Sequence, residues 1–331
     1  MAYAARRFGV SLLIVFVVIT ISFFMIRLMP GNAVEYLYHQ LLQSGTVSPQ
    51  QALEQVQTLY GVNIHESLLQ QYFQYLIGIV HGNLGNSILY PGSSVTKILA
   101  NAIPWTVLTV AISLLLSFFI GISIGTVMAY FQKHVSSTIV TFVMTVLNAI
   151  PNYFVALLLL YWFADLNHVF PTGGAYQAGV TPGWNWNYVL SILSHAALPI
   201  IAYVITSIGG WSLGMKSSVV SVLGEEYITS ARSRGIKNQR IVRSYVARNA
   251  ILPLATSLGL SVGFMFGGSV FIESMFNYPG IGYYLVTAVN GRDYPLMMGS
   301  FILTTVAVVA ANWLTDLMNR YLDPRSNETL S

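Results

Sequence analysis

The chain has 331 residues, of which 55% are hydrophobic and only 8% are charged, and its formal net charge at pH 7 is +4. A soluble globular protein carries roughly 25% charged residues, so this composition excludes a water-soluble domain and indicates a polytopic membrane protein. Cysteine is absent, which excludes a disulfide framework, a thiolate metal site and a thiol nucleophile.

Six apolar segments are long enough to cross a bilayer as helices, which takes about 20 residues. The first segment follows the charged start MAYAARRFGV, which is similar to the start of a signal peptide. Its apolar run is longer than the apolar region of a signal peptide and lacks a convincing cleavage site. We therefore expect this segment to remain in the protein as its first membrane span. The sequence therefore predicts an all-α fold with six transmembrane helices. They cover Gly9–Leu28, Ile103–Phe131, Thr138–Ala164, Ser191–Met215, Leu254–Phe271 and Leu296–Met318.

The basic residues predict the orientation of these helices, because Lys and Arg collect on the cytoplasmic side of membrane proteins. With both termini in the cytoplasm, only Arg27, Lys97 and Arg292 of the 15 Lys and Arg residues would lie outside. This bias explains the net positive charge without nucleic acid as a partner. We therefore expect a multi-pass protein of the plasma membrane with both termini cytoplasmic.

Two segments are expected on the outer side. Within residues 29–100, SPQQALEQVQTLYGV is typical of an amphipathic helix begun by Ser48 and Pro49, and QQYFQYLIGIVHG suggests a second, partly buried helix. The loop Asp165–Tyr188 is rich in Gly, Pro and Trp, and its aromatic residues suit the membrane interface better than a ligand-binding cage. The predicted organisation is residues 1–28 for the cytoplasmic N-terminal tail and first helix, 29–100 for a small external subdomain, 101–318 for a transmembrane core of five helices, and 319–331 for a cytoplasmic tail.

Residues 216–252, between the fourth and fifth predicted helices, form a basic loop. Ser217–Arg234 has a helical pattern that Gly235 is suited to stop, and Asn238 is suited to begin a second helix. That second helix carries an apolar stripe of Ile241, Val242, Tyr245 and Val246. The small residues Ser230, Ala231 and Ser233 beside the turn leave room for a partner to approach. Two interpretations are open: a docking surface for another protein, or a segment that sets topology and touches anionic lipid.

EYITSARSRG, followed by RNAILP, resembles the conserved cytoplasmic "EAA" loop of type I ABC importer permeases, in the form found in the peptide and nickel branch. The positions that match are Glu226, Tyr227, Ala231, Arg232 and Gly235, then Arg248, Asn249, Ala250, Leu252 and Pro253. Thr229 stands where the family pattern has a glutamate, and Ser230 replaces its first alanine, so no single acid is expected to carry the docking.

Further segments resemble successive parts of the same branch, in the right order. They are RLMPGNA, LLQQYFQYLIGIVHGNLGNS, IPNYFVALLLLYWF, FNYPGIGYYLVTAVNGRDYPL and LTDLMNRYLDPR. The resemblance thus covers nearly the whole chain, and the external segment is similar to that of the B-type subunit of the permease pair.

The resemblance implies a permease subunit that works with a second permease subunit, two cytoplasmic ABC ATPase subunits and an external substrate-binding protein. It implies di- or oligopeptides as the substrate, with oligosaccharides or nickel as the alternative. It also implies an ATPase-docking surface formed by Glu226, Tyr227, Ala231, Arg232, Gly235, Arg248 and Asn249.

The positions of the lysines indicate that ATP is bound and hydrolysed on another chain. A phosphate-binding P-loop ends in Gly-Lys-Ser/Thr, and none of the four lysines here follows a glycine. We therefore expect this chain not to be an enzyme and to hold no cofactor, with ATP and Mg²⁺ bound by the ATPase subunits.

Two classes of alternative come from the remaining motifs and composition. Gly210–Gly214 reads G-x-S-x-G around Ser212, which is a hydrolase pattern when it follows a strand. Here the motif ends an apolar helix, and His195 lies on the same helix. Small residues for helix packing therefore explain the motif better than the active site of an intramembrane hydrolase. A passive channel is the other alternative. No cluster of His, Asp or Glu has metal-ligand spacing.

Glycines at four-residue spacing predict close helix packing or a moving gate. They are Gly121 and Gly125 in the second predicted helix, and Gly259, Gly263 and Gly267 in the fifth. The acids Glu273 and Asp316 lie near the ends of predicted helices, close enough to water to snorkel or pair, and we expect structural roles for both.

Overall fold

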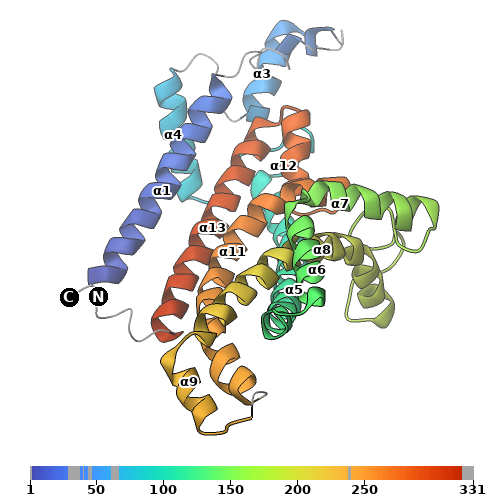
Figure 1. Ribbon diagram of the computed structural model, residues 1–331. Coiled ribbons are helices and arrows are strands. Elements are labelled where there is room, and N and C mark those ends of the chain that lie inside the picture. Colours follow the sequence, from blue (N-terminus) through green and yellow to red (C-terminus); the bar gives the residue numbers. More distant parts are fainter. Residues whose placement is uncertain are drawn as a thin grey trace. The chain divides into compact units, whose positions relative to one another are not determined.

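The computed structural model describes residues 2–28, 38–39, 41–43, 47–60, 67–237 and 240–322. Over these residues the regular elements are helices, and a single isolated bridge joins Asn86 and Ser94. Figure 1 shows their arrangement. They are α1 (Ala2–Arg27), α3 (Pro49–Tyr60), α4 (Leu68–Val80), α5 (Val95–Tyr130), α6 (Val135–Ala149), α7 (Asn152–Leu159), the π-helical segment η1 (Leu160–Leu166), α8 (Trp186–Leu223), α9 (Glu226–Ser233), the π-helical segment η2 (Ile241–Val246), α11 (Ala247–Met275), α12 (Ile281–Asn290) and α13 (Tyr294–Leu322).

Five of the described helices are long and apolar enough to cross a membrane, in α1, α5, α8, α11 and α13. The remaining predicted helix, Thr138–Ala164, which is the third in chain order, is not straight. α6 and the α7–η1 pair meet at a bend of 94°, so they form at most one broken span. The bend follows from Pro151, because the residue before a proline is disfavoured in the helical region; Ile150 is extended, with φ −76° and ψ 126°.

The chain forms two compact units. The first comprises Met1–Thr106 and Tyr278–Val309, and the second comprises Val107–Asn277 and Ala310–Ser331. The predicted boundary at residue 100 stays a prediction, because a division by contacts between residues does not mark where a membrane surface lies.

Both helices expected in the external segment are present. Ser48 precedes α3 and Ser67 precedes α4, and each serine caps its helix. The serine hydroxyl accepts from the backbone N–H of the glutamine three residues on, which is Gln51 in α3 and Gln70 in α4. The side-chain oxygen of the same glutamine accepts from the backbone N–H of the serine. This capping box satisfies N–H groups that would otherwise lack a partner. Residues 29–37, 61–66 and most of the predicted tail, 323–331, lie outside the described residues.

The core of the first unit brings residues of α1, α4, α5, α12 and α13 together, including Phe23, Tyr72, Leu99, Ala288 and Leu296. Asp293, fully buried before α13, organises the chain around it. Its carboxylate accepts from the Ser87 hydroxyl, from the N–H groups of Ile88 and Leu89 at 2.9 and 3.1 Å, and from the N–H of Leu296 at 3.0 Å. Charge-assisted bonds of this kind are about twice as strong as neutral ones. Asp293 therefore holds the turn at residues 87–89 against the start of α13.

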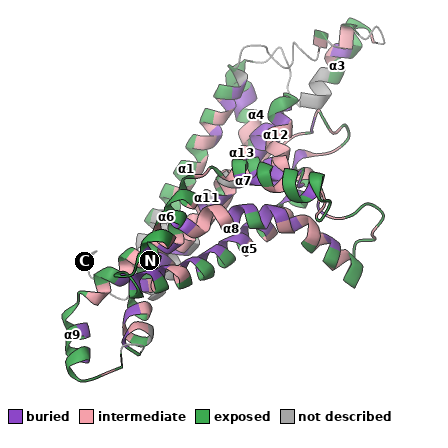
Figure 2. Cartoon of the chain, turned by 45° about the vertical axis from the view of Figure 1, so that its right-hand side comes forward, coloured by how far each residue is buried: buried purple, intermediate pink, exposed green. Residues whose placement is uncertain are grey.

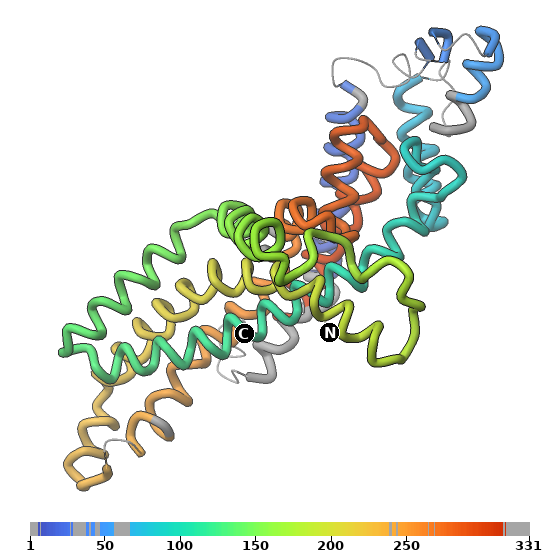
Figure 3. Tube along the Cα trace, turned by 90° about the vertical axis from the view of Figure 1, so that its right-hand side faces the viewer, coloured from blue at the N-terminus to red at the C-terminus, as the bar shows by residue number. Residues whose placement is uncertain are grey.

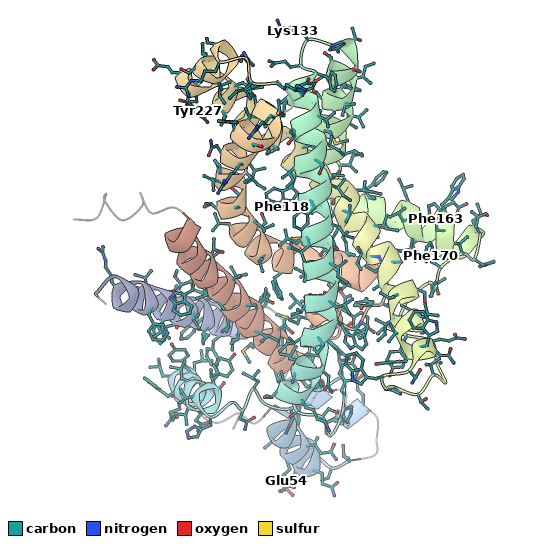
Figure 4. All side chains as sticks on the ribbon, turned by 90° about the horizontal axis from the view of Figure 1, so that it is seen from below. Glu54, Phe118, Lys133, Phe163, Phe170 and Tyr227 are labelled. Atoms are coloured by element: carbon teal, nitrogen blue, oxygen red, sulfur yellow. The ribbon has the colours of Figure 1, made fainter. Side chains whose placement is uncertain are left out.

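In the second unit, α5 and α6 form a hairpin that packs with α8 and α11 (Figure 3). The turn that joins α5 and α6 contains Lys133, and Figure 4 shows Lys133 and Tyr227 of α9 at the same end of this unit. The turn and the basic loop therefore share one end, as the charge distribution requires if both are cytoplasmic.

Candidate functional site

The first part of the basic loop is a short separate helix. α8 ends at Leu223, and α9 begins only at Glu226. The sequence prediction of one helix over Ser217–Arg234 is therefore wrong at its middle. Glu225 is extended, with φ −70° and ψ 144°, and the preceding Gly224, which caps α8, has low helix propensity.

Gly235 ends α9, as predicted. Its φ is +72°, a left-handed conformation that glycine adopts without a steric penalty. The turn is closed by bonds from the N–H of Gly235 to the Arg232 carbonyl at 2.9 Å and from the N–H of Ile236 to the Ala231 carbonyl at 3.3 Å. Open space surrounds the position where a Cβ would stand, so the requirement for glycine comes from the backbone alone.

The second part of the basic loop re-enters the unit through η2 and α11. Asn238, expected to begin this helix, lies outside the described residues. The predicted stripe is confirmed: Ile241 and Val246 are fully buried, and Val242 and Tyr245 are half-buried. The π-helical geometry was not predicted. Its i to i+5 bonds widen the turn, and Ile241 and Val246, five residues apart, both reach the core.

The inner face of α9 packs on this second part and on α8. Ile228 and Ala231 are buried in a cluster with Met215, Val219 and Ile241. The interpretation that Ala231 leaves room for a partner is therefore wrong, because its small side chain faces the protein's own core. Ser230 and Ser233 are exposed and remain on the side that a partner can reach.

The outer face of the loop is exposed (Figure 2). It is also basic, because Arg232, Arg234 and Arg248 are among its exposed residues. The exposed members of the predicted docking set are Glu226, Tyr227, Arg232, Gly235, Arg248 and Asn249. The side-chain amide of Asn249 donates to the Tyr227 hydroxyl at 3.0 Å and to the Tyr245 carbonyl at 2.9 Å. The Ser218 hydroxyl donates to the Ala250 carbonyl at 2.7 Å. These bonds attach α9 and α8 to the start of α11.

Three of the five predicted packing glycines lie against a neighbouring helix. A Cβ on Gly121 would clash with Trp211, one on Gly125 with the backbone of Ser212, and one on Gly259 of α11 with Thr315 of α13. Gly263 is buried. Gly267 is exposed, with nothing near the place of a Cβ, so it makes no close packing contact within this chain.

A cavity of about 520 Å³ lies between α5, α7, α8 and α11. Its lining includes Gly214 of α8 and Pro253 of α11, one on each side of the basic loop in the sequence. Hydroxyl and amide side chains line it together with apolar ones, and its lining includes no charged side chain. The polar members are Asn152, Tyr203, Thr206, Ser207, Ser257 and Ser261. Such a surface offers neutral hydrogen-bonding groups to a solute. No pattern in the sequence predicts this cavity, because serine and threonine are also common at packed membrane helices.

Ser212 and His195 do not form a catalytic pair. Both lie on α8, and their separation of 17 positions corresponds to about 26 Å of helix. The Ser212 hydroxyl is buried and donates to the Ile208 carbonyl at 2.7 Å. Glu273 is also buried, contrary to the expectation that it lies close to water, and it lies near Tyr203. The side chain of Asp316 is outside the described part of the chain.

Comparison with known proteins places this arrangement in a family. Residues 121–328 match the model of the binding-protein-dependent transport system inner membrane component, and residues 1–108 match the N-terminal model of the same transport systems. The chain belongs to this family. Its permease fold is thereby established, and the basic loop lies inside the larger matched region.

Individual relatives agree over nearly the full length. The oligopeptide transport system permease protein AppB of Bacillus subtilis is 30% identical over 98% of each chain. The nickel import system permease protein NikB of Staphylococcus aureus is 29% identical over 95% of this chain and 88% of its own. Among solved structures, a chain of the MetNI methionine ABC transporter in an inward-facing conformation has a TM-score of 0.55 at 14% identity, over 69% of this chain and 97% of its own. That likeness shows the fold alone.

Proposed function

We propose that this chain is one permease subunit of an ATP-driven importer for di- or oligopeptides. The observation that carries the proposal is the exposed, basic outer face of α9, held to α11 by the bond between Asn249 and Tyr227. A lipid-facing topology anchor needs charge but no such hydrogen-bonded frame. A docking helix needs both the charge and the hydrogen bonds, because it has to transmit the movement of its partner to the membrane helices.

The proposed partners are two cytoplasmic ATPase subunits on the basic loop, a second permease subunit beside this one, and an external binding protein that delivers the substrate. ATP and Mg²⁺ are bound and turned over by the ATPase subunits. Their closure moves α9, and the bonds of Asn249 and Ser218 carry this movement into α11 and α8. Both helices line the 520 Å³ cavity, so the movement reaches the region where a solute would pass.

Peptides are favoured over nickel by the chemistry of this cavity. Its hydroxyl and amide groups can bond a peptide backbone whatever the peptide's side chains. Imidazole is a suitable ligand for nickel, and the described residues contain no group of three His, Asp or Glu that would hold a metal. Nickel remains the alternative, supported by the relative from Staphylococcus aureus, because a chelated ion needs no ligand on the permease.

The test is to purify the chain from its native membrane, identify what comes with it, and reconstitute the assembly in liposomes. We expect a second permease and ATPase subunits, and ATP-dependent uptake of a labelled peptide that unlabelled peptides compete away. Uptake of nickel but not of peptide would overturn the substrate. A chain that purifies alone and shows no ATP-dependent uptake would overturn the proposal as a whole.

A further inference from the structure

The helix α4 has three distinct faces. One face packs on α1 through Tyr72 and Tyr75: the ring of Phe23 lies 5.3 Å from that of Tyr72 and 5.5 Å from that of Tyr75. A second face is an exposed apolar stripe of Leu69, Phe73, Ile77 and Val80, with exposed fractions of 62%, 60%, 59% and 83%. A third face is exposed and polar, with Ser67, Gln70, Gln74 and His81.

The contact with α1 fixes the depth of α4. The Tyr72 hydroxyl is 2.7 Å from the Thr20 hydroxyl. Thr20 lies inside the apolar segment Phe8–Ile26 of α1, six residues before its end, or about 9 Å along the helix axis. The middle of α4 is therefore level with the apolar part of a membrane span and not above it.

Helix α1 also has exposed apolar residues near the end that α4 contacts. Ile21 and Met25, near the same end of α1, are exposed at 52% and 65%, and α4 has no charged residue along its length. With 13 residues, α4 is about 20 Å long, too short to cross the hydrocarbon core of about 30 Å. A helix of this kind lies at the boundary between headgroups and acyl chains.

We propose that α4 is embedded in the outer leaflet, with Leu69, Phe73, Ile77 and Val80 against lipid acyl chains and Gln70 and Gln74 toward the headgroups. The segment predicted to be an external subdomain then returns into the membrane before α5 begins. The occupant of the stripe is lipid, because the stripe lies at the depth of a membrane span whose own apolar residues are exposed. Neutral glutamines on the polar face make this contact independent of anionic headgroups, since it lacks the basic residues that such lipids attract.

The absence of cysteine makes a direct test possible. Phe73→Cys and Ile77→Cys each place one thiol on the stripe, and Gln70→Cys and Gln74→Cys are matched controls on the polar face of the same helix. Each variant is labelled with bimane in the complete importer, with partner cysteines substituted, and reconstituted in phosphatidylcholine liposomes. All four native side chains are exposed. Gln70→Cys removes one bond of the capping box with Ser67 and Phe73→Cys removes a ring contact with Tyr72, so uptake activity checks that each variant has assembled.

Fluorescence is then quenched either by brominated acyl chains or by aqueous iodide. We expect brominated lipid to cause most of the fluorescence loss at positions 73 and 77, and iodide to cause most of it at positions 70 and 74, with no change when anionic lipid is added. Equal iodide quenching at all four positions would overturn the proposal in favour of an aqueous external helix. Stripe positions shielded from both quenchers would overturn it in favour of burial against another protein chain.

Discussion

The side-chain amide of Asn249 donates a hydrogen bond of 3.0 Å to the hydroxyl of Tyr227 across 22 residues of the chain. Tyr227 stands in the first turn of α9, and Asn249 stands near the start of α11. The bond joins α9 directly to α11, so that a force on α9 acts on this membrane helix and not only on the chain that connects the two.

The first prediction concerns this bond. Tyr227→Phe keeps the ring and removes the acceptor, and Asn249→Ala removes the donor. Because a hydrogen bond contributes about 0.5–1.5 kcal/mol, the two substitutions should show a coupling of this size in a double-mutant cycle. The measurement is the affinity of the isolated ATPase subunit for the reconstituted permease pair.

Asn187→Ala, exposed at the start of α8 and outside the basic loop, is the control and should leave the affinity unchanged. Effects of Tyr227→Phe and Asn249→Ala that simply add would contradict the role given to the bond.

A second prediction follows from the left-handed turn at Gly235. Alanine in this conformation costs about 1–2 kcal/mol, whereas asparagine tolerates it better. Gly235→Ala should weaken ATPase association and uptake more than Gly235→Asn does, as measured by co-purification and by transport. Gly224→Ala is the control, since Gly224 has a φ of −80°. If Gly235→Asn is as damaging as Gly235→Ala, the glycine is required for a reason other than its backbone conformation.

The packing glycines give a third prediction. Gly259→Ala forces a methyl group into Thr315, and overpacking typically costs about 1–3 kcal/mol. The thermal unfolding midpoint of the solubilised permease should therefore fall. Gly267→Ala meets nothing within the chain and should not lower that midpoint, since alanine favours a helix more than glycine does. The same midpoint for both variants would show that α11 and α13 do not pack as described.

The buried carboxylate of Asp293 gives a fourth prediction. Asp293→Asn keeps the shape but loses the charge that strengthens its bonds to Ser87 and to the N–H groups of Ile88 and Leu89. Bonds to charged groups contribute about 1.5–3 kcal/mol each, so residues 83–94 should become more sensitive to protease. Asp165→Asn, at an exposed position, is the control. Unchanged proteolysis of Asp293→Asn would show that residues 83–94 are held by other contacts.

Much of the fold could be predicted from the sequence because apolar length and the distribution of Lys and Arg are strong signals in membrane proteins. The helices α3 and α4 were also predictable, since a serine at the N-cap and a glutamine three residues on mark each start. The stop at Gly235 was predictable for the same local reason. These features depend on residues close together in the chain.

The remainder depends on contacts between distant residues. The bend before Pro151 was not predicted, because a proline inside an apolar run either breaks or merely kinks a membrane helix; Pro104 and Pro199 lie within continuous helices. The inward position of Ala231 depends on how α9 packs against Met215 and Ile241. Likewise, the bond between Asn249 and Tyr227 and the cavity between α8 and α11 depend on how separate helices come together.

The central claim, that the outer face of α9 receives an ATPase subunit, is tested most directly by cross-linking. Ser230→Cys places a thiol on the exposed side of α9, in a chain with no other cysteine. Asn187→Cys, exposed in the first turn of α8, is the control expected on the opposite side of the membrane. With a short thiol-to-amine cross-linker in native membranes, we predict that Ser230→Cys is joined to an ATPase subunit and that Asn187→Cys is not. Cross-linking of neither variant to any ATPase, in membranes where the chain is intact, would contradict the claim and leave the basic loop as a topology anchor.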